Sequence, residues 1–200
     1  MTTAAASLAP STLADLLPRT RARTVALVVG FALLTAAAAQ ITIPLPWTPV
    51  PLTGTTFAVL LAGASLGWRA GAASQLLYNA FALAGLPFYQ DGHSGWTYAT
   101  GATGGYLFGF VVAAAVVGFL AERGQDRTLA TSVPAMLAGT AVIYLFGVVW
   151  LGHVLEASAV TALEKGMLPF VIGDALKLVV AGALLPAAWR LAPGGPGSRS

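Results

Sequence analysis

Two residues of opposite charge, Asp174 and Lys177, lie three positions apart in a strongly apolar stretch near the C-terminus. Side chains at positions i and i+3 share one face of a helix, so this spacing predicts a carboxylate beside an ammonium group. Charges within a membrane are costly when they face lipid, so both should face a bundle interior or a cavity. The pattern favours a ligand site, and the alternative is an ion pair that only holds two helices together.

Two amide side chains, Gln75 and Asn79, lie one helical turn apart in another apolar stretch. Their i, i+4 spacing places them on the same face of a helix. Because the amide of Asn79 is both a donor and an acceptor, it suits a ligand with a ureido or amide group. The alternative is a hydrogen bond between helices, which polar groups inside a membrane also form.

A further apolar stretch opens with the sequence Thr103-Gly-Gly-Tyr106. Glycine allows a neighbouring backbone or a ligand to approach closely. Tyr106 can present both a ring face and a hydroxyl to a cavity. Close packing of helices through small residues is the alternative reason for the glycines.

The composition places the chain in a membrane. Hydrophobic residues make up 57% of the sequence and charged residues 8%, whereas about 25% of the residues of a soluble domain are charged. So few charges cannot cover the water-exposed surface of a 200-residue protein. The net charge of +3 comes from few residues, so we expect no nucleic-acid partner.

Several kinds of catalytic and metal site are excluded. The chain has no cysteine, which excludes disulfides, iron–sulfur clusters and thiolate nucleophiles, and its two histidines are too few for a histidine-rich metal site. No G-x-x-x-x-G-K-[ST] motif is present, so the chain does not hydrolyse ATP through a P-loop. Serine–histidine and HExxH arrangements are also absent. We therefore expect no enzymatic activity, no metal and no cofactor.

Six apolar runs predict an all-α polytopic membrane protein with six transmembrane helices, at roughly 20 residues per span. The predicted spans are Arg23–Ile41, Thr53–Leu66, Ala70–Leu86, Ala102–Ala121, Val133–Leu151 and Met167–Leu191. We expect this transmembrane domain to cover residues 22–191, between flexible cytoplasmic tails at residues 1–21 and 192–200.

The basic residues indicate the orientation of these spans. With six spans, eight of the ten basic residues fall on one side of the membrane: Arg19, Arg21, Arg23, Arg69, Arg123, Arg127, Arg190 and Arg199. Lys165 falls on the other side, and Lys177 lies within a span. Cytoplasmic loops carry an excess of Lys and Arg, so this distribution predicts that both termini are cytoplasmic.

The first predicted outer connection, Thr42–Leu52, contains four prolines with Trp47 in their midst. Such a density of proline prevents a helix and favours extended, polyproline-like backbone. A stiff segment is suited to covering or lining a ligand site. The alternative for Trp47 is an interfacial aromatic belt. The second outer connection, Pro87–Gly101, brings further aromatic residues, among them Tyr98.

The run Gln40-Ile-Thr-Ile-Pro-Leu-Pro-Trp-Thr-Pro-Val-Pro-Leu-Thr53 resembles the first outer loop of the BioY family of biotin transporters. Two further stretches, Thr103–Phe110 and Gly173–Lys177, are similar to other signatures of that family, and the resemblance covers about residues 25–190. One departure is visible. The sequence Thr53-Gly-Thr-Thr56 stands where the family often has Thr-Leu-Gln-Thr, so a glutamine amide is absent at Thr55.

The resemblance implies both a fold and a function. BioY proteins are substrate-binding S components of energy-coupling factor (ECF) vitamin transporters, with a six-helix bundle that binds biotin. The resemblance implies that this chain lies in a bacterial cell membrane, captures biotin from outside the cell and delivers it to the cytoplasm. An energy-coupling transmembrane subunit and ABC-type ATPases would be its partners, and only these ATPases would use ATP. The alternatives are an S component for another vitamin and a structural membrane subunit without transport.

The resemblance also assigns residues. Asp174 and Lys177 match the polar pair on the family's last helix, and Asn79 matches its polar position on the third. The predicted biotin-binding residues are Asn79, Asp174, Lys177, Tyr106, Trp47, Thr103, Tyr98 and Thr53. S components contact their coupling partner through an Ala-x-x-x-Ala pair, and two pairs fit that spacing here: Ala22 with Ala26, and Ala32 with Ala36.

Overall fold

The computed structural model describes residues 10–18 and 20–191. Its long helices are α1 (Arg21–Ala39), α2 (Thr55–Leu66), α3 (Trp68–Leu83), α5 (Gly104–Glu122), α6 (Leu129–Val154) and α8 (Val171–Leu191). Each predicted apolar run corresponds to one of these helices, with ends that differ by at most four residues. The short elements are η1 (Leu13–Leu16), β1 (Thr42–Ile43), β2 (Leu52–Thr53), η2 (Gln90–Gly92), α4 (Gly95–Ala99) and α7 (Ala159–Gly166).

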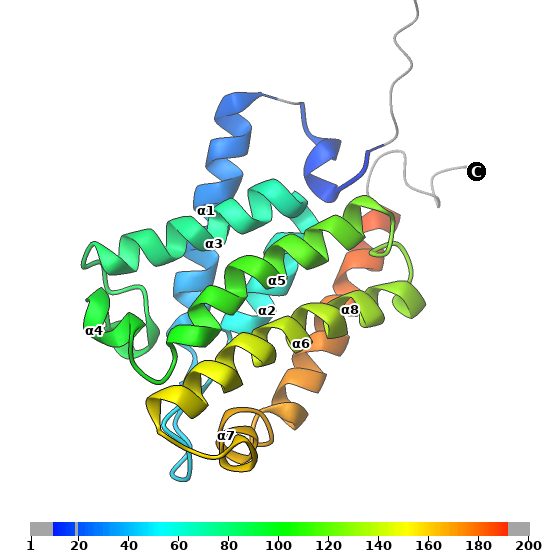
Figure 1. The fold of residues 1–200 in the computed structure, drawn as a ribbon. Coiled ribbons are helices and arrows are strands. Elements are labelled where there is room, and N and C mark those ends of the chain that lie inside the picture. Colours follow the sequence, from blue (N-terminus) through cyan, green and yellow to red (C-terminus); the bar gives the residue numbers. More distant parts are fainter. Residues whose placement is uncertain (1–9, 19, 192–200) are drawn as a thin grey trace, which may run out of the picture.

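Helix α5 lies at the centre of the bundle and packs against α2, α3 and α6 (Figure 1). Helix α1 packs against α2 and α3, and α8 packs against α2 and α6. Small residues bring the backbones close together, since a Cβ on Gly63 would lie 2.5 Å from the carbonyl oxygen of Ala114. Contact through small residues is typical of helix pairs in membranes, where burial of apolar surface does not drive association.

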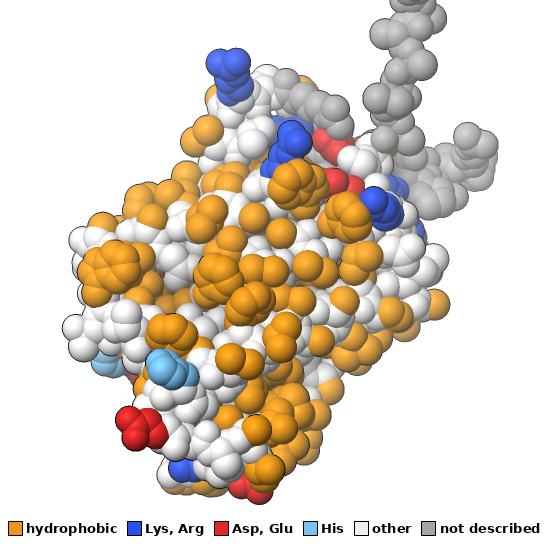
Figure 2. Space-filling view, in the orientation of Figure 1, with side chains coloured by type: hydrophobic (Ala, Val, Ile, Leu, Met, Phe, Trp, Pro, Cys, Tyr) orange, Lys and Arg blue, Asp and Glu red, His pale blue; other side chains and the backbone are white. Residues whose placement is uncertain are grey.

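The two ends of the bundle differ in character. The α2–α3 turn, the α5–α6 connection and the end of α8 lie at one end, which we call the basic end (Figure 1). The β1–β2 hairpin, α4 and α7 lie toward the other end, which we call the hairpin end (Figure 1). Hydrophobic side chains cover much of the visible surface in between, and most of the visible Lys and Arg side chains gather at the basic end (Figure 2).

Among the described residues, four helices are long and apolar enough to cross a membrane: α1, α5, α6 and α8. Helix α2 is a shorter apolar helix of 12 residues, and α3 has 16. The hydrocarbon core of a bilayer needs about 20 helical residues, so these two fall short individually. The structure is thus all-helical apart from the hairpin, with four candidate spans.

The proline-rich segment is closed by a short antiparallel ribbon. Thr42 pairs with Thr53, and Ile43 pairs with Leu52. All four prolines fall in the loop between the two strands, where their missing N–H groups remove no ribbon hydrogen bond. The backbone N–H of Gly54 donates to the carbonyl of Ala38 (3.1 Å), which ties the ribbon to the end of α1. Helix α2 accordingly begins at Thr55, two residues later than predicted.

Part of the predicted N-terminal tail packs on the basic end. The side chain of Thr12 is buried, and Arg127 Nη2 donates to the carbonyl of Pro10 (2.7 Å). Arg127 also pairs with the buried Asp126, which accepts a hydrogen bond from Trp189 Nε1 (2.5 Å). Burial raises the pKa of Asp126 above its usual value, although the hydrogen bond from Trp189 and the charge of Arg127 act in the opposite direction. Residues 1–9, 19 and 192–200 lie outside the described residues, so the predicted division into tails and core stays a prediction.

Candidate binding site

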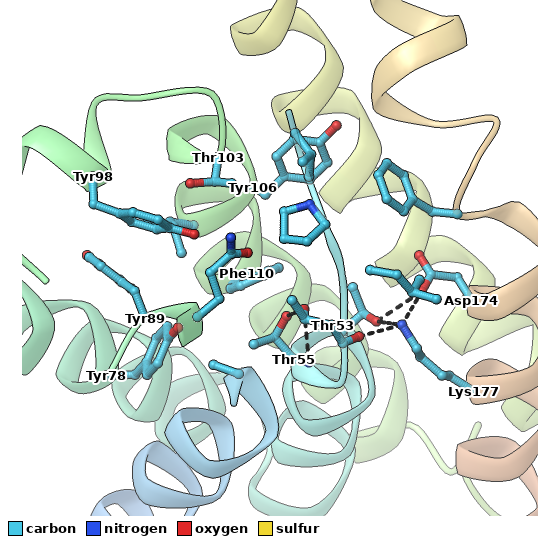
Figure 3. A pocket seen from close by; sticks show the side chains of 18 residues that line it. Thr53, Thr55, Tyr78, Tyr89, Tyr98, Thr103, Tyr106, Phe110, Asp174 and Lys177 are labelled. Atoms are coloured by element: carbon cyan, nitrogen blue, oxygen red, sulfur yellow. Dashed lines mark hydrogen bonds and ion pairs between the residues drawn. The ribbon is translucent and has the colours of Figure 1, made fainter. Parts of the chain in front are cut away.

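A cavity of about 60 Å³ lies beneath the hairpin, where α2, α3, α5 and α8 converge (Figure 3). Its lining residues are Ala39, Val50, Pro51, Leu52, Thr53, Thr55, Thr56, Tyr78, Tyr89, Gln90, Tyr98, Thr103, Tyr106, Leu107, Phe110, Phe170, Asp174 and Lys177. Pockets for small molecules usually measure about 300–1,000 Å³, so a vitamin-sized ligand requires part of this wall to move.

Lys177 forms one polar wall of the cavity (Figure 3). Its Nζ donates to Asp174 Oδ1 (2.8 Å), the carbonyl of Thr53 (2.5 Å) and Thr56 Oγ1 (3.3 Å). An ammonium group has three N–H donors, so all three are engaged. Because Thr53 belongs to β2, one of these bonds ties the hairpin to α8. A ligand group that binds Nζ therefore has to replace one of these contacts.

Asp174 is 5% exposed and lies in the first turn of α8, where the helix dipole favours an anion. Its Oδ1 accepts hydrogen bonds from Lys177 and from Thr56 Oγ1 (3.1 Å), and its Oδ2 accepts one from Tyr144 (2.7 Å). A carboxylate has about four acceptor positions, so roughly one remains for a donor in the cavity.

Three tyrosines lie on the opposite side of the cavity: Tyr78, Tyr89 and Tyr98 (Figure 3). The rings of Tyr89 and Tyr98 stack with centroids 4.9 Å apart, and Tyr78 meets Tyr89 edge to face at 5.8 Å. Burial raises the pKa of both Tyr89 and Tyr98 to about 12, so their hydroxyls remain neutral at physiological pH. This wall offers flat apolar surface with polar tips, which suits a ring system that carries polar groups.

Tyr106 lies between these two walls (Figure 3). Its hydroxyl donates to the carbonyl of Gly166 at the end of α7 (2.6 Å), and its ring packs over Gly147 of α6. A side chain at either glycine would collide with Tyr106. The tyrosine thus links α5, α6 and α7 beside the cavity.

The structure brings most of the predicted site residues together. Those that line the cavity are Thr53, Tyr98, Thr103, Tyr106, Asp174 and Lys177. Trp47 does not line it, because its side chain is 61% exposed in the loop of the hairpin. The part of the proline-rich segment that faces the cavity is Val50–Leu52.

Asn79 lies behind the cavity wall rather than in it. Its Nδ2 donates to the carbonyls of Gln75 (2.9 Å) and Leu107 (3.3 Å), and its Oδ1 accepts from Tyr89 Oη (3.3 Å). The hydrogen bond between helices that the sequence left open as an alternative is therefore present. Asn79 supports two lining residues, Leu107 and Tyr89, and a ligand that displaced the Tyr89 hydroxyl would meet its amide oxygen.

Several residues of the site were not predicted from the sequence. Thr56, Tyr78 and Tyr89 line the cavity, and Gln40 holds the loop that carries Tyr89. Gln40 Nε2 donates to the carbonyl of Tyr89 (3.0 Å), and its Oε1 accepts from the N–H of Gly92 (3.1 Å). For two of them the sequence offered an indication, because Gln40 begins the proline-rich motif and Tyr78 directly precedes Asn79.

The sequence matches the BioY family over residues 7–194. The chain belongs to this family. It is 36% identical over 161 residues to a probable biotin transporter BioY from Pyrococcus horikoshii, which covers 80% of this chain and 93% of the relative. The biotin transporter BioY of Thermotoga maritima is 37% identical over 139 residues, which cover 70% of this chain and 80% of the relative.

The fold is similar to the crystal structure of the S-component for biotin from an ECF-type ABC transporter. The TM-score is 0.77 and the identity 22%, over 84% of this chain and 93% of that chain. The resemblance to BioY proteins noted in the sequence is thus confirmed. The family comprises transporters rather than enzymes, and together with the apolar helices it makes the protein a multi-pass membrane protein with bacterial and archaeal relatives.

Proposed function

We propose that the protein is the biotin-binding S component of an ECF-type importer. The observation that carries the proposal is the Asp174–Lys177 pair in the cavity wall, opposite a wall of tyrosines, in a BioY protein. Biotin combines a ureido ring, an apolar thioether bicycle and a carboxylate. Asp174 offers an acceptor, Lys177 offers a cation, and Tyr89 and Tyr98 offer ring faces.

Ligand access in this proposal involves the hairpin. The cavity is too small for biotin as it stands, and the hairpin is one of the parts of its wall that lie outside the long helices. Lys177 holds the hairpin through the carbonyl of Thr53, so a ligand that takes over this donor also releases the hairpin. Thr48 Oγ1 donates to the carbonyl of Lys165 (2.7 Å), which gives the loop a second tether on α7. The hairpin would move about its two ends, because its prolines stiffen the loop between them.

We propose further that six helices span the membrane, with the basic end and both termini in the cytoplasm. Helices α2 and α3 are joined at Gly67, at the basic end. Together, these two shorter helices cross the membrane twice and return the chain to the hairpin end. The positively charged residues at the basic end support this orientation. Biotin would then be captured from outside and delivered to the cytoplasm.

Labelling of single cysteines tests this topology, since the chain has no cysteine of its own. A cysteine at Thr97 on α4 should react with a membrane-impermeant maleimide in intact cells, because α4 lies at the hairpin end. A cysteine at Gln125 in the α5–α6 connection should react only after the membrane is opened. Reaction of both positions from the same side would contradict the six-span arrangement.

The partners in this proposal are an energy-coupling transmembrane subunit and ABC-type ATPases, which alone hydrolyse ATP. Of the two Ala-x-x-x-Ala pairs, Ala22 and Ala26 are exposed on α1. Ala32 is 0% exposed and Ala36 8% exposed, both inside the hydrophobic core. Exposure therefore favours Ala22 and Ala26 as the pair that contacts the coupling subunit.

A thermal-shift measurement on the purified protein tests the function itself. A ligand that binds only the folded state stabilises it by RT ln(1 + [L]/Kd), so biotin at about 100 times its Kd should add about 2.7 kcal/mol. We expect a saturable rise in the unfolding temperature with biotin and none with other vitamins. A rise with a different vitamin would make the protein another S component, and no rise with any would favour a structural subunit.

A further inference from the structure

The carboxylate of Asp174 is held on both of its oxygens by residues from three helices. Lys177 on α8 and Thr56 on α2 donate to Oδ1, while Tyr144 on α6 donates to Oδ2 at 2.7 Å. The first two donors belong to the cavity lining, and Tyr144 does not. The hydroxyl of Tyr144 therefore reaches Asp174 from outside the cavity.

The ring of Tyr144 belongs to a different space. It lines an apolar groove of about 660 Å³ between α6 and α7, together with Leu145, Val148 and Leu163. Of the side chains that line this groove, the Tyr144 hydroxyl is the one that bonds to the ion pair. The tyrosine is thus half-buried, with its ring in apolar surroundings and its polar tip on a buried carboxylate.

This arrangement determines how Asp174 presents itself to the cavity. With donors on one oxygen only, a carboxylate can still rotate about its terminal torsion, which is broad for aspartate. A second donor on the other oxygen fixes that torsion and so fixes the direction of the remaining acceptor position. Without Tyr144, Oδ2 would also lack its protein donor at a buried position, which is costly for a charged group.

We propose that Tyr144 is a positioning residue for ligand binding: its hydroxyl fixes the Asp174 carboxylate in the orientation that accepts a ligand donor. This inference rests on the proposed function, because the ligand it positions Asp174 for is biotin. Tyr144 acts through Asp174 and makes no contact with the cavity itself. Its hydroxyl makes the contact with Asp174, while its ring lines the groove and packs against the hydrophobic core.

The test is Tyr144→Phe, which removes the hydroxyl and leaves the ring in the groove. A hydrogen bond to a charged group should make this change weaken biotin binding about tenfold or more in a titration of the purified protein. The matched control is Thr140→Val, one turn earlier on α6. It removes a buried hydroxyl that donates to the carbonyl of Met136 (3.0 Å) and should leave the affinity unchanged.

Infrared spectroscopy with 13C-labelled aspartate separates positioning from a general loss of structure. The Asp174 carboxylate band, identified by its loss in Asp174→Asn, should shift in Tyr144→Phe and stay in place in Thr140→Val. An unchanged affinity, or a lower affinity without a band shift, would overturn the inference.

If Tyr144→Phe gives no folded protein, 3-fluorotyrosine at position 144 provides a second variant. It changes the acidity of the hydroxyl donor, so the Asp174 carboxylate band must then move. Failure of the wild type to bind biotin would instead reject the proposed function, and the band shift would still be measurable.

Discussion

Lys177→Ala is expected to weaken biotin binding by at least about tenfold, because removal of one partner of a buried ion pair costs about 3–5 kcal/mol. The ammonium group of Lys177 makes three contacts, and the Asp174 carboxylate would keep only its neutral donors Thr56 and Tyr144. The variant also releases the carbonyl of Thr53 and with it the hairpin. A ligand would thus lose both a cationic contact and an ordered wall.

Isothermal titration with biotin measures this loss, and the unfolding temperature shows whether the variant is folded. Lys165→Ala, on α7 and outside the cavity lining, is the control and should bind biotin as the wild type does. Asp174→Asn should also bind more weakly, but it should fold better than Lys177→Ala, since it leaves no unpaired anion in the core. Unchanged affinity in folded Lys177→Ala protein would exclude the role assigned to Lys177.

The ion pair could be predicted because it depends on local geometry. Asp174 and Lys177 are three residues apart on one helix, and apolar surroundings force both charges inward. The other contacts of the pair come from positions 30 to 124 residues away, in the hairpin, α2 and α6. The periodicity of one helix carries no information on which distant hydroxyl will contact its ion pair. The contacts of Thr56 and Tyr144 with the pair could therefore be found only from the structure.

The helices followed from composition, while their ends and the short elements did not. A long run of apolar residues predicts a long helix. Helix α4 has 5 residues and α7 has 8, so both are too short to be recognised from such a run. Helix α7 depends on its cap, since Ser158 Oγ accepts from the N–H of Thr161 (3.2 Å). Helix α6 begins four residues earlier than predicted, because its first turn mixes apolar with polar residues (Leu-Ala-Thr-Ser) and so does not stand out as an apolar run.

The aromatic residues show where prediction from residue type fails. Trp47 and the tyrosines are equally plausible as walls of a pocket, since all combine a large ring with a polar group. The structure leaves Trp47 61% exposed and buries Tyr78 and Tyr89 to 1% exposure. The difference lies in tertiary contacts: the hydrogen bonds of Gln40 draw the Tyr89 loop against α1, whereas Trp47 is an exposed side chain in the loop between β1 and β2.

A second large effect is expected from Gly147→Ala. The Cβ of an alanine would lie 2.5 Å from Cζ of Tyr106 and closer still to two other ring carbons, which real structures do not tolerate. The ring would have to leave its place, and the hydrogen bond from Tyr106 to Gly166 would be lost. Since Tyr106 lines a cavity of about 60 Å³, its displacement reshapes the site. Overpacking of this kind costs about 1–3 kcal/mol of folding stability. Because the displaced ring no longer forms the wall of the site, biotin should also bind about tenfold more weakly or worse.

Gly30→Ala provides the matched control for this change. Gly30 lies inside α1, and a Cβ there would meet no atom within 4 Å. Alanine in a helix interior is favoured over glycine by about 0.5–1 kcal/mol, so Gly30→Ala should raise the unfolding temperature slightly and leave biotin affinity unchanged. The two variants add the same methyl group to two helices, so a difference in their affinity reports on Tyr106 rather than on glycine. Equal affinity of Gly147→Ala and the wild type would mean that the Tyr106 ring is no wall of the biotin site.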